Sequence, residues 1–254
     1  MKMMRLDRFL AEASSMTRSQ VKDVIRAGRV RVCSAPAVKG DVKIDPAKDD
    51  VELDGERVYL PGERWIMLCK EEGYVTARKD DFSPCVTEFL GKELSDKVFP
   101  VGRLDIDTTG LLMICNDGEL AHRLLSPARH VDKVYEAVVS GEIGAKEICM
   151  FAQGLAISEE WTCLPAKLKV LEGGLSMPDQ AEDASRVSVT ICEGKFHQIK
   201  RMFSKIDSQV LSLKRLSMGS LQLDDKLQPG QYRRLTREEI ASLRIDAGLE
   251  KPDS

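Results

Sequence analysis

The sequence lacks the common phosphate-binding and metal-binding signatures. It has no Gly-x-Gly-x-x-Gly loop and no Gly-x-x-x-x-Gly-Lys-Ser/Thr loop, which are typical of nucleotide-binding enzymes. None of its seven cysteines forms a Cys-x-x-Cys pair, the spacing typical of zinc sites. With only three histidines, at positions 122, 130 and 197, no Ser-His-Asp or Cys-His arrangement is evident. The sequence therefore predicts neither a nucleotide cofactor nor a metal ion.

Long apolar stretches are also missing. None approaches the roughly 18 to 20 residues that span a bilayer, and the first residues contain no apolar core of signal-peptide length. The odd number of cysteines, most of them among apolar neighbours, suggests reduced thiols. These absences predict a soluble, cytoplasmic protein without membrane contact.

What the sequence does contain is enough apolar material for a packed core. It has 254 residues, of which 43% are hydrophobic, so it can form one large domain or a small domain followed by a medium one. The 38 basic and 41 acidic residues give a net charge of −3, which argues weakly against a general polyanion binder. Net charge hides local clustering, however, and clustering decides contact with nucleic acids.

The N-terminal segment is locally basic. Residues 1–31 carry eight basic and three acidic side chains. Apolar spacing predicts a helix over residues 5–13 and a second helix that starts at Thr17. Thr17 and Gln20 form a capping-box pattern at its start, and a glycine at position 28 suits its end.

Three basic residues of the second helix, Arg18, Lys22 and Arg26, are spaced by four and form one line, called the basic stripe below. A basic helix face is often only a solvated surface. Here the charge converges from both helices and from the predicted strand 29–32, which favours contact with phosphates. The following residues are acidic and rich in turns up to Pro61-Gly62, where we place a domain boundary.

The remaining residues predict one α+β domain over residues 61–248, followed by a frayed tail at 249–254. The patterns favour strands at 65–69, 111–115, 133–139 and 186–192, paired strands within 210–223, and helices at 119–125, around 199–206 and after Thr236. Thr236 and Glu239 form a capping-box pattern for the last helix. Residues 173–185 are expected to form a mobile loop.

By elimination, candidate chemistry falls on two carboxylates, Asp105 and Asp107, in the stretch VGRLDIDTTGLL. The stretch resembles the nucleophile loop of haloacid-dehalogenase-type phosphatases, in which two such carboxylates hold magnesium. That loop must follow directly on an apolar strand, whereas here residues 99–103 intervene and the apolar strand comes afterwards. A polar loop that merely precedes a strand is the second alternative.

Four signals in the right order resemble the ribosomal small-subunit pseudouridine synthase A (RsuA-like) family over nearly the whole chain. Residues 102–105 (GRLD) with 108–112 (TTGLL) resemble the catalytic motif of pseudouridine synthases. Residues 133–135 (KVY) resemble the second motif and residues 193–203 (EGKFHQIKRMF) the third. The first 60 residues resemble the small S-four-like RNA-binding domain that precedes these enzymes.

The resemblance implies a fold and an activity. The fold is α+β: an S-four-like RNA-binding domain at residues 1–60 and a catalytic domain whose mixed, mainly antiparallel sheet is flanked by helices. The activity is site-specific isomerisation of uridine to pseudouridine in ribosomal RNA, without cofactor or metal. His197-Gln198 resembles the branch that modifies 16S rRNA more than the 23S branch. The expected partner is ribosomal RNA or a ribosomal-subunit assembly intermediate, and a monomer is expected.

The resemblance also implies roles for individual residues. Asp105 is the single catalytic carboxylate, which can act at the sugar as a nucleophile or as a base. Tyr135 holds the extruded base, and Lys200 keeps Asp105 ionised, with Arg201 as the neighbouring candidate for that cation. Asp107 is expected to cap the turn. Because Asp105, Tyr135 and Lys200 are all present, an RNA chaperone with an inactive synthase domain is disfavoured.

A further set of residues is expected to bind RNA. Its members are Arg5, Arg8, Arg18, Lys22, Arg26, Arg29, Arg103, Lys195, His197, Gln198 and Arg201. Arg103 is a candidate for filling the space that the extruded base vacates, or for binding a phosphate. Two stretches depart from the family pattern. Lys70-Glu71-Glu72-Gly73 stands where the family has Lys-Pro-x-Gly, and Cys33-Ser34-Ala35-Pro36 stands where the turn after the strand usually has Asn-Gly.

Overall fold

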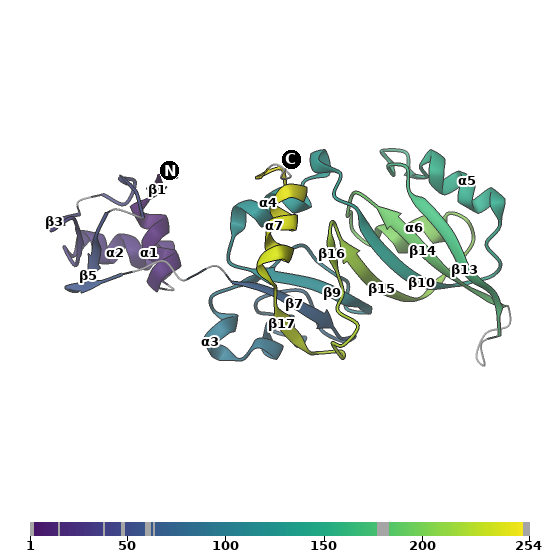
Figure 1. The fold of residues 1–254 in the computed structure, drawn as a ribbon, viewed down its shortest axis with the longest axis horizontal. Coiled ribbons are helices and arrows are strands. Elements are labelled where there is room, and N and C mark those ends of the chain that lie inside the picture. Colours follow the sequence, from purple (N-terminus) through teal and green to yellow (C-terminus); the bar gives the residue numbers. More distant parts are fainter. Residues whose placement is uncertain are drawn as a thin grey trace. The chain divides into compact units, whose positions relative to one another are not determined.

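The computed structural model describes residues 3–14, 16–37, 39–46, 49–58, 62, 64–176 and 183–250. The chain divides into two units, Met1–Glu63 and Arg64–Ser254 (Figure 1). This division lies three residues after the boundary expected between residues 60 and 61. Each unit has a core of its own, and they are described separately.

The N-terminal unit packs two helices on a small sheet. The helices are α1 (Leu6–Ser14) and α2 (Arg18–Arg26). The sheet has the order β3 (Ala35–Pro36), β2 (Val30–Val32), β5 (Val51–Leu53), β6 (Glu56–Arg57), and β1 (Met4–Arg5) pairs separately with β4 (Lys43–Ile44). Thr17 and Gln20 form the predicted capping box of α2, and Gly28 follows its end with φ +71°. Both predictions are confirmed.

The C-terminal unit is built on one mixed sheet. Its order is β13 (Lys167–Leu175), β14 (Ala184–Ile191), β10 (Lys133–Ser140), β15 (Val210–Met218), β9 (Thr108–Cys115), β7 (Trp65–Lys70) and β17 (Tyr232–Arg234). Two short strands, β8 (Phe99–Pro100) and β16 (Leu221–Gln222), pair with β9 and β15. The pairing of β9 with β15 is parallel, and the other described pairings are antiparallel. The expected mixed, mainly antiparallel sheet is therefore confirmed.

Helices cover both faces of this sheet (Figure 1). The helical segments are η1 (Val86–Leu90), α3 (Lys92–Ser95), α4 (Gly118–Leu125), η2 (Pro127–Arg129), α5 (Ala145–Gln153), α6 (Gln198–Ser204) and α7 (Arg237–Asp246). A small hairpin joins β11 (Ala156–Ser158) to β12 (Trp161–Thr162). Helices α4 and α7 bury their apolar residues in one core cluster, while α5 and α6 contribute to the other.

Alternation along the central strands assigns side chains to these two clusters. On β9, Leu112 and Ile114 belong to the cluster of α5 and α6, whereas Leu111, Met113 and Cys115 belong to that of α4 and α7. Because both faces are covered, residues 111–115 of the strand are all apolar and do not alternate with polar residues. This explains why an uninterrupted apolar run follows the Asp-Ile-Asp stretch.

The structure corrects the expectation for residues 173–185. Strand β13 continues to Leu175 and β14 begins at Ala184, so both ends of the segment belong to paired strands. Residues 177–182 lie outside the described residues. At the C-terminus, where a frayed tail was expected from residue 249, Leu249 packs on a core cluster and Glu250 pairs with Arg244. Residues 251–254 lie outside the described residues.

The sequence predicts reduced thiols and no membrane-spanning segment. All seven cysteines are free, and four of them are buried. Across the described ranges, the helices are too short or too polar to cross a membrane.

Candidate active site

The loop that carries Asp105 lies between β8 and β9, and Thr76 forms hydrogen bonds to its backbone. The hydroxyl of Thr76 donates to the carbonyl oxygen of Leu104 at 2.7 Å and accepts from its amide at 3.1 Å. Thr76 is 7% exposed, so these bonds are shielded from water. They fix the backbone of Leu104, the residue before Asp105. The side chain of Asp105 is 27% exposed.

Lys70 holds the other side of the same loop. Its ammonium is buried and donates to the carbonyl oxygens of Thr108 at 2.8 Å, Glu71 at 3.0 Å and Ile106 at 3.2 Å. Burial lowers the pKa of Lys70 to about 8, although the nearby carboxylates partly oppose this shift. The amide of Gly73 also donates to Ile106, at 2.8 Å. The stretch Lys70–Gly73, which departs from the family pattern, therefore still shapes the loop of Asp105.

The parallel contact between β9 and β15 brings a third segment to this loop. It pairs Leu213 with Thr108, Lys214 with Thr109 and Arg215 with Gly110. Gly110 has φ +95°, and a Cβ there would lie 2.3 Å from the carbonyl oxygen of Arg215. Only glycine fits this approach. The buried side chain of Arg215 returns a hydrogen bond from its Nε to the Leu111 carbonyl oxygen at 2.7 Å.

Helix α6 contributes the cation of the site. The Nζ of Lys200 lies 2.6 and 2.7 Å from the two oxygens of Asp107 and 3.5 Å from Oδ2 of Asp105. Burial would raise the pKa of Asp107, but its hydrogen bond and charge pairing with Lys200 outweigh this and lower it. We expected Asp107 only to cap the turn, whereas its carboxylate is the closer partner of Lys200. From the first residue before α6, Nε2 of His197 lies 3.6 Å from Oδ1 of Asp105.

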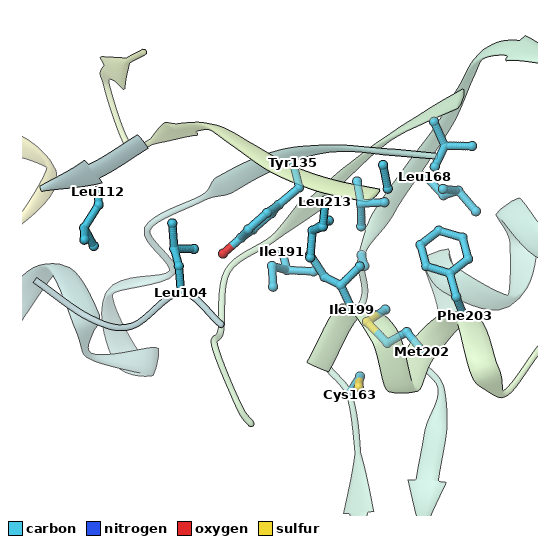
Figure 2. Packing of buried hydrophobic residues seen from close by; sticks show 14 of the residues in the cluster. Leu104, Leu112, Tyr135, Cys163, Leu168, Ile191, Ile199, Met202, Phe203 and Leu213 are labelled. Carbon is cyan, nitrogen blue, oxygen red and sulfur yellow. The ribbon is translucent and has the colours of Figure 1, made fainter. Parts of the chain in front are cut away.

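These side chains surround an open pocket. It is lined by Arg103, Leu104, Asp105, Thr108, Tyr135, Ile191, His197, Gln198, Ile199, Lys200 and Leu213. Tyr135 extends from β10 with its hydroxyl on the side of Leu104, beside Ile191 and Leu213 (Figure 2). The ring is 6% exposed and belongs to the core, so it is both a packed strand residue and a wall of the pocket. The predicted Asp105, Tyr135 and Lys200 therefore meet at one place.

Other residues of the third motif make contacts within the protein. Arg201 lies over the ring of Trp161, with its Cζ 4.5 Å from the centroid, and Nζ of Lys195 lies 4.8 Å from the same centroid. Lys200, not Arg201, is therefore the residue that reaches Asp105. Gln198 is 3% exposed and its amide is bound within the protein, so its side chain orders the loop that precedes α6.

In the N-terminal unit, the predicted RNA-binding residues fall into two groups. Three arginines, called the paired arginines below, form close ion pairs: Arg5 with Asp7, Arg8 with Glu12 and Arg29 with Asp54, at 2.6 to 2.7 Å. The basic stripe is exposed, and its one ion pair among the described residues joins Arg26 to Asp23 at 3.5 Å. The stripe is thus the more available cationic surface of this unit.

Sequence reasoning did not find the positioning roles of Thr76 and Arg215. Both act on backbone atoms of segments remote in the sequence, so no local pattern marks them. Lys70 could have been found, because it is the lysine of the Lys-Pro-x-Gly stretch. Within the described part of the chain, no group of three or more His, Cys, Asp or Glu side chains could hold a metal ion.

Comparison with known proteins assigns the class of this site. Residues 64–205 match the family model described as RNA pseudouridylate synthase. The chain therefore belongs to the RNA pseudouridylate synthase family, whose members are isomerases that act on RNA. This confirms the resemblance drawn from the motifs and overturns the phosphatase alternative.

Relatives in this family match nearly the whole chain. It is 38% identical over 242 residues to a ribosomal small subunit pseudouridine synthase A of Yersinia pestis, covering 94% of this chain and 98% of that protein. It is also 38% identical over 240 residues to an uncharacterised RNA pseudouridine synthase of Bacillus subtilis, covering 93% and 97%. A crystal structure of a pseudouridylate synthase aligns with a TM-score of 0.67 and 33% identity, covering 94% of this chain and 99% of that one.

Proposed function

We propose that this protein isomerises a specific uridine of 16S ribosomal RNA to pseudouridine. The observation that carries the proposal is the meeting of Asp105, Tyr135 and Lys200 at one pocket inside the region that matches the family. Several relatives that align over about 94% of this chain are named ribosomal small subunit pseudouridine synthase A, which supports the choice of RNA.

The reaction needs one well-placed carboxylate. The bond between the sugar and N1 of uracil breaks, the base turns, and C5 bonds to the same sugar carbon. C5 loses its proton and N1 gains one, so the composition of the RNA is unchanged. Asp105 acts at the sugar, either as a nucleophile or as a base. The ammonium of Lys200 lies 3.5 Å from this carboxylate.

The apolar walls of the pocket suit a flipped base. Uridine must leave its stack before the carboxylate can reach the sugar. Tyr135, Leu104 and Leu213 then offer it an aromatic and aliphatic surface, and the exposed Arg103 also lines the pocket. No cofactor is required in this scheme.

The N-terminal unit supplies affinity and placement. We assign it to the S-four-like class of RNA-binding domains, because it carries the basic stripe on an exposed helix and precedes the catalytic unit. Its partner is ribosomal RNA, free or within a ribosomal-subunit assembly intermediate.

The test is to map pseudouridines in ribosomal RNA from cells with and without this protein. Loss of one pseudouridine from 16S rRNA is expected, and purified protein should restore it in an unmodified 16S transcript. Loss from 23S rRNA instead would contradict the choice of RNA. Unchanged maps together with an inactive purified protein would contradict the whole proposal.

A further inference from the structure

The loop before α6 presents an aromatic ring to solvent. Phe196 is 73% exposed. One face of its ring stacks on the imidazole of His197, with centroids 3.7 Å apart and an interplanar angle of 20°. A single exposed apolar residue is common on protein surfaces. A ring that is held by a stack on one face and open on the other is a more specific feature.

The loop that carries Phe196 is ordered from within the protein. The Gln198 amide donates to Oε1 of Glu193 at 2.7 Å and accepts from the backbone amide of Lys195 at 3.0 Å. The same Glu193 oxygen accepts from the amide of Leu164 at 2.9 Å. Gln198 and Glu193 are 3% and 7% exposed. Phe196 is therefore preorganised, and little conformational entropy is lost when a ligand stacks on it.

The position of this ring relates it to the pocket. His197, on which Phe196 stacks, lies 3.6 Å from Asp105 and lines the pocket. Phe196 therefore contacts a residue of the pocket wall without lining the pocket itself. Lys195, the preceding residue, is held over Trp161 together with Arg201. Aromatic faces accompanied by cations are the surfaces that single-stranded nucleic acids bind.

We propose that the open face of Phe196 stacks on an unpaired nucleobase adjacent to the target uridine. When the target uridine leaves its stack, its neighbour loses a stacking partner, and the Phe196 ring replaces it. RNA fits this surface better than a protein partner because the feature is a single ring next to Lys195 in the sequence, not an extended apolar patch. The inference rests on the proposed function, since it requires an RNA substrate.

The test combines protein variants with RNA variants. The probe is a synthetic RNA hairpin with the 16S sequence around the mapped uridine, intact or with an abasic residue at each neighbouring position in turn. Phe196→Ala should lower kcat/KM on the intact RNA by about five- to a hundredfold, the range expected for loss of one base stack. On the RNA that lacks the stacked base, Phe196→Ala and the wild type should be equal. Phe196→Trp should retain the wild-type activity.

A matched control is Phe82→Ala, which removes a ring that is 97% exposed and does not line the pocket. It should leave kcat/KM unchanged on every RNA. Equal losses from Phe196→Ala on all abasic RNAs would show that the ring only supports His197, which would overturn the inference. Wild-type activity of Phe196→Ala on intact RNA would overturn it as well. The proposed function fails separately, if mapping of ribosomal RNA finds no pseudouridine that depends on this protein.

Discussion

Asp105 and Asp107 lie two residues apart on one loop but in different surroundings. Asp105 faces the pocket and is 27% exposed, whereas Asp107 is 51% exposed and binds Lys200 through both oxygens. A carboxylate that reacts must reach the sugar from inside the pocket. In the proposed reaction the chemistry therefore falls to Asp105, and Asp107 orients the lysine that both carboxylates share.

Substitution of each aspartate by asparagine separates these roles. Asp105→Asn should lower the single-turnover rate on the target RNA by about 10²- to 10⁴-fold or more, because the charge that acts at the sugar is lost. Asp107→Asn should lower it by about tenfold or less, because an exposed ion pair contributes about 1 kcal/mol or less. RNA affinity, measured in the same assays, should survive both changes. Equal losses in the two variants would refute the assignment.

The buried Lys70 predicts a pH-dependent stability. Its pKa is lowered to about 8 by burial in the folded state, so the unfolded chain binds this proton more tightly. The free energy of unfolding should therefore rise as the pH increases through about 8, and level off near the ordinary lysine value. Relative to Lys70→Met, the wild type should gain up to about 3 kcal/mol over this interval. Urea unfolding of both proteins at several pH values from about 7 to 10 measures this difference in stability. The titration of groups that both proteins share cancels in the difference. A pH-independent difference would show that Lys70 keeps its proton.

At the level of elements, one glycine permits the parallel pairing that assembles the site. A side chain at Gly110 would collide with the Arg215 backbone, and the positive φ adds strain. Gly110→Ala should destabilise the catalytic unit by about 2 to 4 kcal/mol and sharply reduce activity, because β9 and β15 would separate beside Asp105. Gly118→Ala is the control, since Gly118 begins α4 with open space around it. It should be neutral or stabilise by up to about 1 kcal/mol. Thermal unfolding distinguishes the two.

The hairpin between β2 and β3 is strained by its sequence. Cys33 and Ser34 form the two-residue turn with φ of +48° and +67°, the positive values for which Asn-Gly is preferred. The double substitution Cys33→Asn with Ser34→Gly should therefore stabilise the hairpin by about 1 to 2 kcal/mol. Hydrogen exchange of the β2 amides measures this, with Ser34→Ala as a control that should not slow exchange.

Elements with a local signal could be predicted from the sequence. The Thr236–Glu239 box marks the start of α7, and alternation along residues 133–139 marks β10. Helix α5 gave no such signal because its cap is Glu147 binding the amide of Gly144, without a capping side chain before it. The end of strand β13 resembles a loop in its sequence because it is exposed, contains glycine and is ordered only by pairing with β14.

The candidate site was predictable only where a motif carried it. Asp105, Tyr135 and Lys200 could be named because each falls in a family motif. The hydrogen bonds of Thr76 to Leu104 could not, because they join a side chain to backbone atoms 28 residues away. Lys70 stands in a family stretch, but its bond to Thr108, 38 residues away, leaves no pattern in the sequence either. Sequence patterns report periodicity and caps, whereas such contacts depend on which strands become neighbours.

For the whole molecule, a net charge of −3 must be reconciled with a polyanionic substrate. The net charge matters less than which cations are available to bind phosphates. The paired arginines are already neutralised by nearby carboxylates, whereas the basic stripe is exposed along α2. Binding of RNA releases counterions in proportion to the phosphates that such free cations neutralise. Net charge is therefore a poor guide here, and the salt dependence of binding is the informative quantity.

Changing all three residues of the basic stripe to alanine should flatten this salt dependence. Each lost phosphate contact lowers the slope of log K against log salt by about 0.7 to 0.9, so the triple variant should lose about 2 to 3. The matched control changes the paired arginines to alanine, which removes the same charge but should alter the slope by less than about 1. Affinities for 16S RNA at several salt concentrations give both slopes. An unchanged slope in the stripe variant would show that the stripe is an ordinary solvated helix face that does not contact phosphates. A larger change in the control would show that RNA displaces the carboxylates from the paired arginines.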